Sequence, residues 1–415
     1  MSDTPAAKSR ATGIVSPTGR FEPLDGLRGY FLVFMLLNHL SFQNGYFLVK
    51  LNVGELSFVQ DAPGFVFLSG LLIGMVYTGR MAKRGLMGAA PQMWRRALEL
   101  FVYAVACLAA ALVLAKLIPH THAAWKPWLG DLIGGGPAFK AAALALIYQP
   151  TYMDILPQYI VYLTVAPPLL WLCARGHWHW VAIGSALMWL AVQFGLHLPL
   201  AGAINGALDR LHDGLEMRAT FNMMAWQLVF MVGMVLGSLT MQGVIDWRSV
   251  FDPRRHRLMT AALALVVFFL AIKLSWTAGL LPSAMLMRFG EFDIRPEFSA
   301  IYMLNFAAMA YVVGWLMVAG PRSSSRAARG AGAFLDGLFR LRFLRLLGRH
   351  SLQVYAWHVV LVYLLCAWDR HAGPLPELWK NLAAVAAVAA LALPALWRER
   401  NELWTRPELA PLRTR

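Results

Sequence analysis

The first apolar stretch of the sequence contains three ionisable side chains, Asp25, Arg28 and His39. On a helix they form one stripe, because eleven steps of about 100° bring Arg28 and His39 to within about 20° of each other. If the stretch crosses a membrane, His39 lies roughly 22 Å along the helix from Leu24, in the outer third of a core about 30 Å thick. Ionisable groups are costly inside a bilayer, so each of the three is a candidate for function.

His39 is the strongest candidate for chemistry. A carboxylate that orients a histidine fixes its tautomer and stabilises the imidazolium formed when the ring takes a hydroxyl proton, as general-base catalysis requires. Asp61 and Asp154 begin later apolar stretches at the same outer level, and His358 lies near mid-membrane. We therefore predict His39 as the base, Asp61 as its orienting carboxylate and His358 as a further catalytic group.

Each of these residues also has a structural interpretation. His39 and His358 could be histidines that are hydrogen-bonded between helices. Asp25 and Arg28 could form a buried ion pair that locks the first helix, although an interior arginine also suits a phosphate or a carboxylate. We predict a substrate-binding role for the polar residues on or near this level: Asp25, Arg28, Asp154, Asn222, Trp226 and Gln227.

Two basic clusters suit the phosphates of an anionic cofactor. One lies between the second and third apolar stretches, and the other falls within about 60° on a helical wheel in the segment 334–348 and just after it. The alternative for the second cluster is an interfacial helix that binds lipid headgroups. The residues predicted to bind donor phosphates are Arg80, Arg84, Arg95, Arg96, Arg342, Arg345 and Arg349.

The composition is that of a membrane protein. Of 415 residues, 59% are apolar and only 14% are charged, with a mean hydropathy of +0.54. This excludes a soluble enzyme, a disordered chain and a disulfide scaffold. The net charge of +15 does not indicate nucleic-acid binding, because sixteen Trp and long apolar runs are foreign to such proteins.

Ten stretches are long and apolar enough to span a bilayer, which takes about 20 residues. We predict an all-α polytopic fold over residues 24–397 with no soluble domain, between a disordered tail, 1–23, and a second tail, 398–415. The predicted spans are Leu24–Gln43, Asp61–Arg80, Met93–Ile118, Asp154–Cys173, Trp178–His197, Phe221–Met241, Arg257–Leu280, Ser299–Gly320, Gly348–Trp368 and Pro376–Trp397.

The basic residues predict the orientation. With a cytoplasmic N-terminus, the inward segments hold twenty-six of the 37 Lys and Arg residues and the outward segments hold ten. Both tails, 1–23 and 398–415, are therefore expected in the cytoplasm, and the first helix is an uncleaved anchor.

Other patterns argue against further kinds of site. The H-x-H pairs at His120 and His177 lack a Cys or acidic partner, so we expect no metal site. The three cysteines lie in predicted spans at different depths, and no internal repeat indicates a transporter with inverted symmetry. Glycines at 64, 70 and 74 predict close helix packing.

Five blocks of the sequence resemble the OpgC-type membrane proteins, which modify osmoregulated periplasmic glucans and belong with the transmembrane acyltransferases. The blocks are "LDGLRGYFLVFMLLNH", "DAPGFVFLSG", "DILPQYIVY", "FNMMAWQLVFMVG" and "LGRHSLQVYAWH". The resemblance implies ten helices, His39 as the functional histidine, and Arg28, Asp61 and His358 as its companions. Gln158, in the third block, joins the predicted substrate-binding residues. The segment 290–306 fits the family less well.

The resemblance further implies a cytoplasmic acyl-CoA donor, succinyl-CoA or acetyl-CoA, and a periplasmic glucan hydroxyl as acceptor. We therefore expect a multi-pass O-acyltransferase, with succinyl as the expected group, in the inner membrane of a bacterium. Its partners would be lipids, acyl-CoA and glucan, with no nucleic acid and no permanently bound cofactor. The oligomeric state, and the choice between direct transfer and an acyl-histidine, stay open. The alternatives are a flippase or transporter for a sugar-linked precursor and an acetyltransferase for another envelope polysaccharide.

Overall fold

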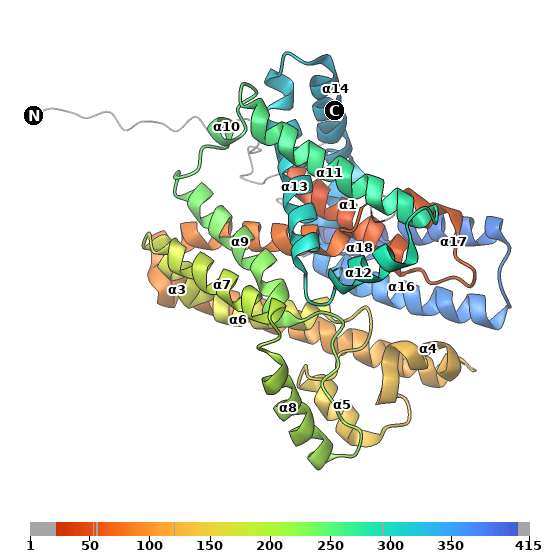
Figure 1. The fold of residues 1–415 in the computed structure, drawn as a ribbon. Coiled ribbons are helices and arrows are strands. Elements are labelled where there is room, and N and C mark those ends of the chain that lie inside the picture. The colour runs from red at the N-terminus through yellow and green to blue at the C-terminus, as the bar shows by residue number, and fades with distance from the viewer. Residues whose placement is uncertain (1–21, 53, 55–56, 120, 293, 406–415) are drawn as a thin grey trace, which may run out of the picture.

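The computed structural model of the protein describes residues 22–405, apart from 53, 55–56, 120 and 293 (Figure 1). Within these residues all regular elements are helices, and extended backbone pairs only in an isolated bridge between Tyr148 and Arg218. The predicted all-α fold is confirmed for this part of the chain. The predicted tail 1–23 lies outside it, except for two residues that begin the first helix.

Twelve elements make up most of the structure. They are α1 (Glu22–His39), α3 (Asp61–Leu117), α6 (Ile155–Ala174), α7 (Trp178–Gln193), α8 (Leu198–Leu211), α9 (Met223–Met241), α11 (His256–Thr277), α13 (Ala300–Val318), α14 (Arg326–Phe339), α16 (Ser351–His371), α17 (Glu377–Ala390) and α18 (Ala392–Thr405). The shorter ones are η1 (Phe47–Leu51), α4 (Thr121–Leu129), η2 (Gly130–Leu132), α5 (Gly136–Leu144), α10 (Trp247–Val250), α12 (Ser283–Phe292), η3 (Gly320–Arg322) and α15 (Arg342–Arg349).

The structure bears out a polytopic membrane protein without fixing the number of spans. Seven helical segments of the described chain are long and apolar enough to cross a bilayer, and the pair α7 and α8, bent by 73°, would make eight. Two predicted spans fall within α3, a 57-residue element whose helical backbone breaks at Gly85, where φ is +67°. α1 carries three charged residues among its 18 and is not one of these seven segments. The count of ten stays a prediction.

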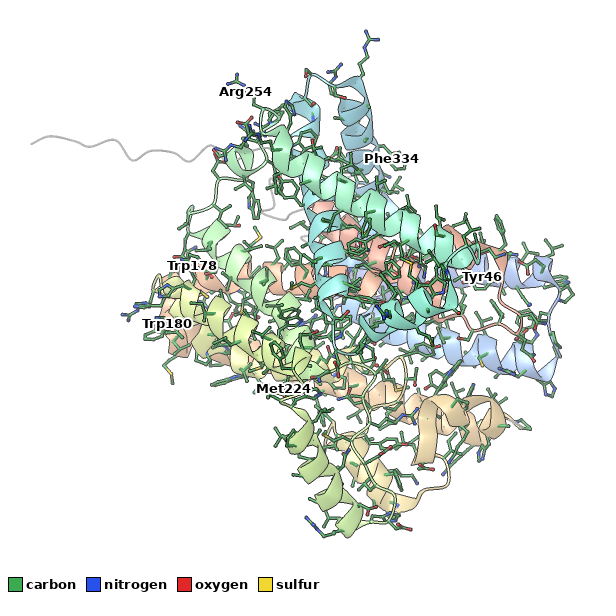
Figure 2. The ribbon with its side chains drawn as sticks, viewed as in Figure 1. Tyr46, Trp178, Trp180, Met224, Arg254 and Phe334 are labelled. Atoms are coloured by element: carbon green, nitrogen blue, oxygen red, sulfur yellow. The ribbon has the colours of Figure 1, made fainter. Side chains whose placement is uncertain are left out.

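The outer helices expose large apolar side chains, as lipid-facing helices do. Trp180 on α7 is 62% exposed and Phe268 on α11 is 58% exposed. Trp178 and Trp180 lie at the left-hand edge of the molecule in Figure 2. In water such a surface would be unfavourable, whereas hydrocarbon is as apolar as these side chains.

Glycines let two pairs of helices approach to backbone contact. A Cβ added at Gly70 would lie 2.1 Å from the carbonyl oxygen of Phe230, so α3 and α9 pack with almost nothing between them. A Cβ at Gly29 would lie 1.9 Å from the carbonyl oxygen of Leu344, so α15 packs equally closely on α1. The predicted close packing at glycine is confirmed.

Four helices that come from predicted loops lie at opposite edges of the molecule. Helices α5 and α8, from predicted outward loops, lie at the bottom of Figure 1, whereas α10 and α14, from predicted inward loops, lie at the top. The orientation that the basic residues favour stays a prediction.

A cysteine at Ser324 provides the test of orientation. Ser324 is exposed beside the basic helix α14, and we expect no labelling by an impermeant thiol reagent added to intact cells. A cysteine at Asp213, exposed in a predicted outward loop, should label readily and serves as the matched control. The native cysteines are buried and give little background. Labelling at Ser324 with protection at Asp213 would reverse the orientation.

Candidate active site

Two histidines from distant parts of the chain form a hydrogen-bonded pair at the centre of the site. His39 is the last residue of α1, and its Nδ1 lies 3.1 Å from Nε2 of His358 on α16. His358 is fully buried, and His39 is half-buried. The structure therefore brings together the two histidines that the sequence singled out.

The backbone sets the direction of the hydrogen bonds in this pair. Nδ1 of His358 lies against the carbonyl oxygen of Tyr355, which can only accept, so this nitrogen carries the proton. Nε2 of His358 is then the acceptor, and Nδ1 of His39 donates to it. In neutral His39 the unprotonated atom is therefore Nε2, which is the lone pair that a general base needs.

The position of His39 at a helix end offsets part of the cost that burial places on a protonated ring. The residue lies in the last turn of α1, where unpaired carbonyl groups give the helix end a partial negative charge. An imidazolium formed there is stabilised by the helix end and by its hydrogen bond to His358.

The loop after α1 fixes the end of that helix. Asn44 and Gly45 both have positive φ, 64° and 67°, and turn the chain back. The buried carboxylate of Asp369 accepts from the Gln43 N–H at 2.7 Å, and the buried Lys380 ammonium donates to the Gly45 carbonyl at 3.0 Å. These contacts hold His39 in place, and sequence reasoning missed both charged residues.

Tyr152 is a second residue that sequence reasoning missed. Its ring centroid lies 4.3 Å from that of His39, and its hydroxyl is 3.0 Å from Oγ of Ser41. The backbone φ of +71° is rare for an aromatic residue, and the Tyr355 hydroxyl holds it by donating to the Tyr152 carbonyl at 2.8 Å. Burial is the main cause that raises the pKa of Tyr152, which keeps the phenol a neutral donor.

The predicted pairing of His39 with Asp61 is not what the structure shows. The Asp61 carboxylate, 4% exposed at the start of α3, accepts from the amides of Asn38 at 2.6 Å and Asn52 at 3.2 Å. His358 occupies the place that the carboxylate was expected to take, because α16 rather than α3 faces Nδ1 of His39. Asp61 still lies beside the site through Asn38, the residue before His39.

Arg28, eleven residues before His39 on α1, joins this helix to two others. Its guanidinium donates to Oγ of Ser351 at 2.6 Å and lies 5.5 Å from the centre of the Phe65 ring. Asp25 is close enough for its charge to act on Arg28, as the ion-pair interpretation expects. Arg28 and His39 therefore both face α16, as their common stripe predicted.

The predicted substrate-binding residues take two kinds of place. Asp154 and Gln158 are buried at the start of α6, and Oδ2 of Asp154 has no hydrogen-bond partner among the described residues. By contrast, Asn222 caps α9 by accepting from the Met224 N–H, and Gln227 exchanges hydrogen bonds with Ser185 on α7. The polar atoms of these last two residues are already used in structure.

Trp226 anchors a loop in the segment 290–306, whose sequence resembles the family less well than the other blocks do. The indole N–H of this fully buried residue lies 3.3 Å from the carbonyl oxygen of Arg295 and 3.1 Å from that of Pro296. The anchored loop brings Arg295 near the end of α1 and the starts of α3 and α6. Its charge is within electrostatic reach of four side chains there: His39, Asp61, Tyr152 and Asp154.

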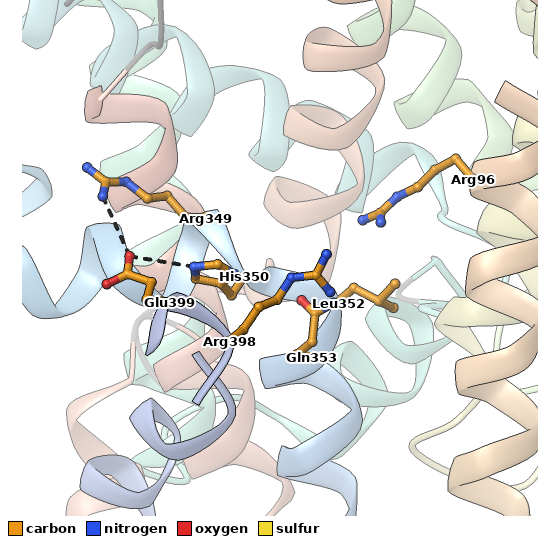
Figure 3. A pocket seen from close by; sticks show the side chains of 7 residues that line it. All are labelled: Arg96, Arg349, His350, Leu352, Gln353, Arg398 and Glu399. Atoms are coloured by element: carbon orange, nitrogen blue, oxygen red, sulfur yellow. Dashed lines mark ion pairs between the residues drawn. The ribbon is translucent and has the colours of Figure 1, made fainter. Parts of the chain in front are cut away.

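A basic pocket lies at the predicted inner end of α16. The cavity of about 180 Å³ is lined by Arg96 of α3, Arg349 of α15 and Arg398 of α18, together with a single carboxylate, Glu399 (Figure 3). Glu399 pairs weakly with Arg349 at 3.8 Å. The remaining lining residues are His350, Leu352 and Gln353. Three guanidinium groups around one small cavity suit a phosphate.

Only two of the seven predicted donor-binding arginines, Arg96 and Arg349, line this pocket. Arg345 pairs instead with Glu22 at 2.9 Å, because α15 packs against α1. Arg398 was assigned to the tail 398–415, but α18 continues through it to Thr405. The other predicted residues lie on exposed parts of the surface outside the pocket: Arg80, Arg84, Arg95 and Arg342.

Together these observations define a helical membrane protein with a paired-histidine site and a separate basic pocket. Residues 20–402 match the family model described as "OpgC protein". The chain therefore belongs to the OpgC family, which indicates a glucan-modifying acyltransferase. Comparison with curated proteins and with solved structures gave no match.

Proposed function

We propose that the protein is an O-acyltransferase that moves an acyl group, succinyl, from cytoplasmic acyl-CoA to a hydroxyl of a periplasmic glucan. The observation that carries the proposal is the ordered His39–His358 pair, which leaves Nε2 of His39 free to accept a proton. Membership of the OpgC family supports the same class of reaction. We place the protein in a bacterial inner membrane with both termini in the cytoplasm.

His39 acts as the general base in the proposed reaction. Nε2 of His39 takes the proton of the glucan hydroxyl while its oxygen attacks the thioester carbonyl. The new C–O bond forms, the C–S bond breaks, and the CoA thiolate leaves with the proton that His39 returns. His358 stabilises the imidazolium between these steps by accepting from Nδ1 of His39.

The basic pocket binds the phosphates of the donor in this proposal. From the pocket residue Leu352 to His358, α16 rises by about 9 Å, so a donor bound by its phosphates can extend its thioester toward the histidine pair. The pocket lies on the side that the basic residues assign to the cytoplasm, where acyl-CoA is made. Arg28 lies at the level of the pocket, where it donates to Ser351.

Sided vesicles test the donor site. Purified protein in vesicles should transfer the acyl group only when acyl-CoA is supplied on the face that carries the Arg349 pocket. Arg349→Gln and Arg398→Gln should each raise KM for acyl-CoA by about tenfold with little change in kcat, because a contact to the non-reacting part of the donor supplies uniform binding. Mass spectrometry of the glucan product names the acyl group.

Arg342→Gln is the matched control, since Arg342 is exposed on the same helix α15 but lies outside the pocket. If the pocket binds lipid headgroups instead, the Arg349 and Arg398 variants would insert less well and keep an unchanged KM. Transfer with donor only on the opposite face would contradict the proposed site and favour a transporter that carries a sugar-linked precursor.

A further inference from the structure

Among the described residues, Arg295 has an aromatic neighbour and no ion-pair partner. Its guanidinium carbon lies 5.3 Å from the centre of the Phe221 ring, and neither an ion pair nor a guanidinium hydrogen bond is made with any described residue. The side chain is only half-buried. A guanidinium has five donors, so this one keeps its capacity to bind an anion.

The loop around Arg295 is held rigidly by its backbone. The Trp226 indole lies within hydrogen-bonding distance of the carbonyls of Arg295 and Pro296, and the Asn222 N–H donates to the Pro296 carbonyl at 2.8 Å. Phe298 packs on Trp226 with ring centroids 5.3 Å apart. The backbone is fixed, whereas the guanidinium makes only the Phe221 ring contact among the described residues, as expected for a group that binds a ligand.

A chain of contacts connects Arg295 with the histidine pair. Arg295 lies over Phe221, and the Phe221 carbonyl lies 3.5 Å from the amide nitrogen of Gln158 on α6. Four residues earlier, Asp154 precedes α6, and the ring of the nearby Tyr152 lies against His39. The guanidinium is therefore linked to the site through these contacts, and its charge acts on His39 and Tyr152.

We propose that Arg295 binds a terminal carboxylate on the transferred acyl group, so that the enzyme selects a dicarboxylic acyl donor such as succinyl over a neutral one. The inference rests on the proposed acyl transfer and adds the residue that reads the acyl group. A guanidinium holds a carboxylate through two parallel hydrogen bonds, whereas a neutral acyl group would leave the charge unpaired. Arg295 is thus a specificity residue and takes no part in proton transfer.

Arg295 also lies near two carboxylates, Asp61 and Asp154, which supply the competing explanation. If its only role were to balance them, its loss would affect every donor alike. Asp61 already accepts from two asparagine amides, which satisfies much of its hydrogen-bonding capacity without Arg295. Selectivity between charged and neutral donors separates the two roles.

The experiment compares succinyl-CoA with its methyl ester, a donor of nearly the same shape without the charge, on a neutral glucan acceptor. For the unaltered protein, kcat/KM should favour succinyl-CoA. Arg295→Gln should lower that preference by about 10- to 100-fold, the range expected when a charge-assisted pair is lost. Arg295→Lys keeps the positive charge but lacks the planar guanidinium, so it should lose part of the preference for succinyl-CoA. This variant replaces Arg295→Gln in the experiment if the Gln variant does not accumulate.

Arg288→Gln is the matched control, because Arg288 is exposed on α12 in the same outer segment, and it should keep the preference of the unaltered protein. Equal use of both donors by the unaltered protein would overturn the proposal. So would an equal loss with both donors in Arg295→Gln, which identifies a counter-ion, or a loss that appears only with an anionic glucan, which places the anion on the acceptor. Failure of the proposed function is a different result, namely no transfer from either donor.

Discussion

His39→Ala is expected to lower acyl transfer by about 100- to 10,000-fold, the range that general-base catalysis contributes, while the protein still accumulates in the membrane. His39 is half-buried at the end of α1, so its removal leaves the packing of that helix on α15 intact. His358→Ala should cost less, because it removes the acceptor that orients the His39 ring but leaves the base itself. Initial rates of glucan acylation by purified protein in vesicles measure both effects.

His177→Ala is the control for these variants, since His177 is exposed on the surface just before α7 and should keep normal transfer. Two outcomes would count against the mechanism. Normal transfer by His39→Ala excludes His39 as the base. A His39→Ala protein that fails to accumulate indicates a histidine that joins α1 and α16 for structural reasons only.

Sequence reasoning found the two histidines because the bilayer makes an ionisable side chain conspicuous. His39 is the last residue of the 18-residue helix α1. Because each helical residue rises by a fixed distance, the depth of His39 in the membrane follows from its position in the sequence. The common stripe of Arg28 and His39 follows from the helical repeat alone, and both residues do meet α16.

The partners across helices could not be predicted in the same way. Asp61 was placed at the correct level, but which helix faces Nδ1 of His39 depends on helix rotation and packing, and these are set by glycine contacts such as Gly29 against Leu344. A level in the membrane limits the set of neighbours without choosing among them. His358 and not Asp61 therefore became the partner of His39.

Loop residues were missed for a related reason. Tyr152 and Arg295 lie in segments with no periodic pattern, and they reach the site through backbone contacts to Tyr355 and Trp226. The sequence contained a signal for the turn after α1, because the Asn44–Gly45 pair is a strong turn former. It contained no signal for the buried Asp369, whose carboxylate accepts a hydrogen bond from the Gln43 N–H at that turn. Such anchors depend on tertiary structure, which a pattern along the chain does not specify.

Gly74→Val is expected to destabilise the protein by about 3 kcal/mol or more, at or beyond the upper end of the usual cost of overpacking. A Cβ at Gly74 would lie 2.2 Å from the Met234 carbonyl oxygen and 2.8 Å from the Ser238 nitrogen, both in the backbone of α9. No side-chain rotation relieves such a clash, so the two helices must move apart. Gly184→Val introduces the same residue into α7, where a Cβ meets nothing within 4 Å, and it controls for the change in helix propensity.

The melting temperature of detergent-solubilised protein, followed by size-exclusion chromatography after heating, measures the difference between these two variants. Separation of α3 from α9 also breaks the hydrogen bond from Thr78 to Ser238 at 2.9 Å, and it shifts the helix that carries Trp226 and hence the loop of Arg295. Gly74→Val should therefore lose both stability and acyl transfer, whereas Gly184→Val keeps both. Equal melting temperatures for the two variants would show that α3 and α9 are not in backbone contact in the membrane, and the position assigned to Arg295 would lose its support.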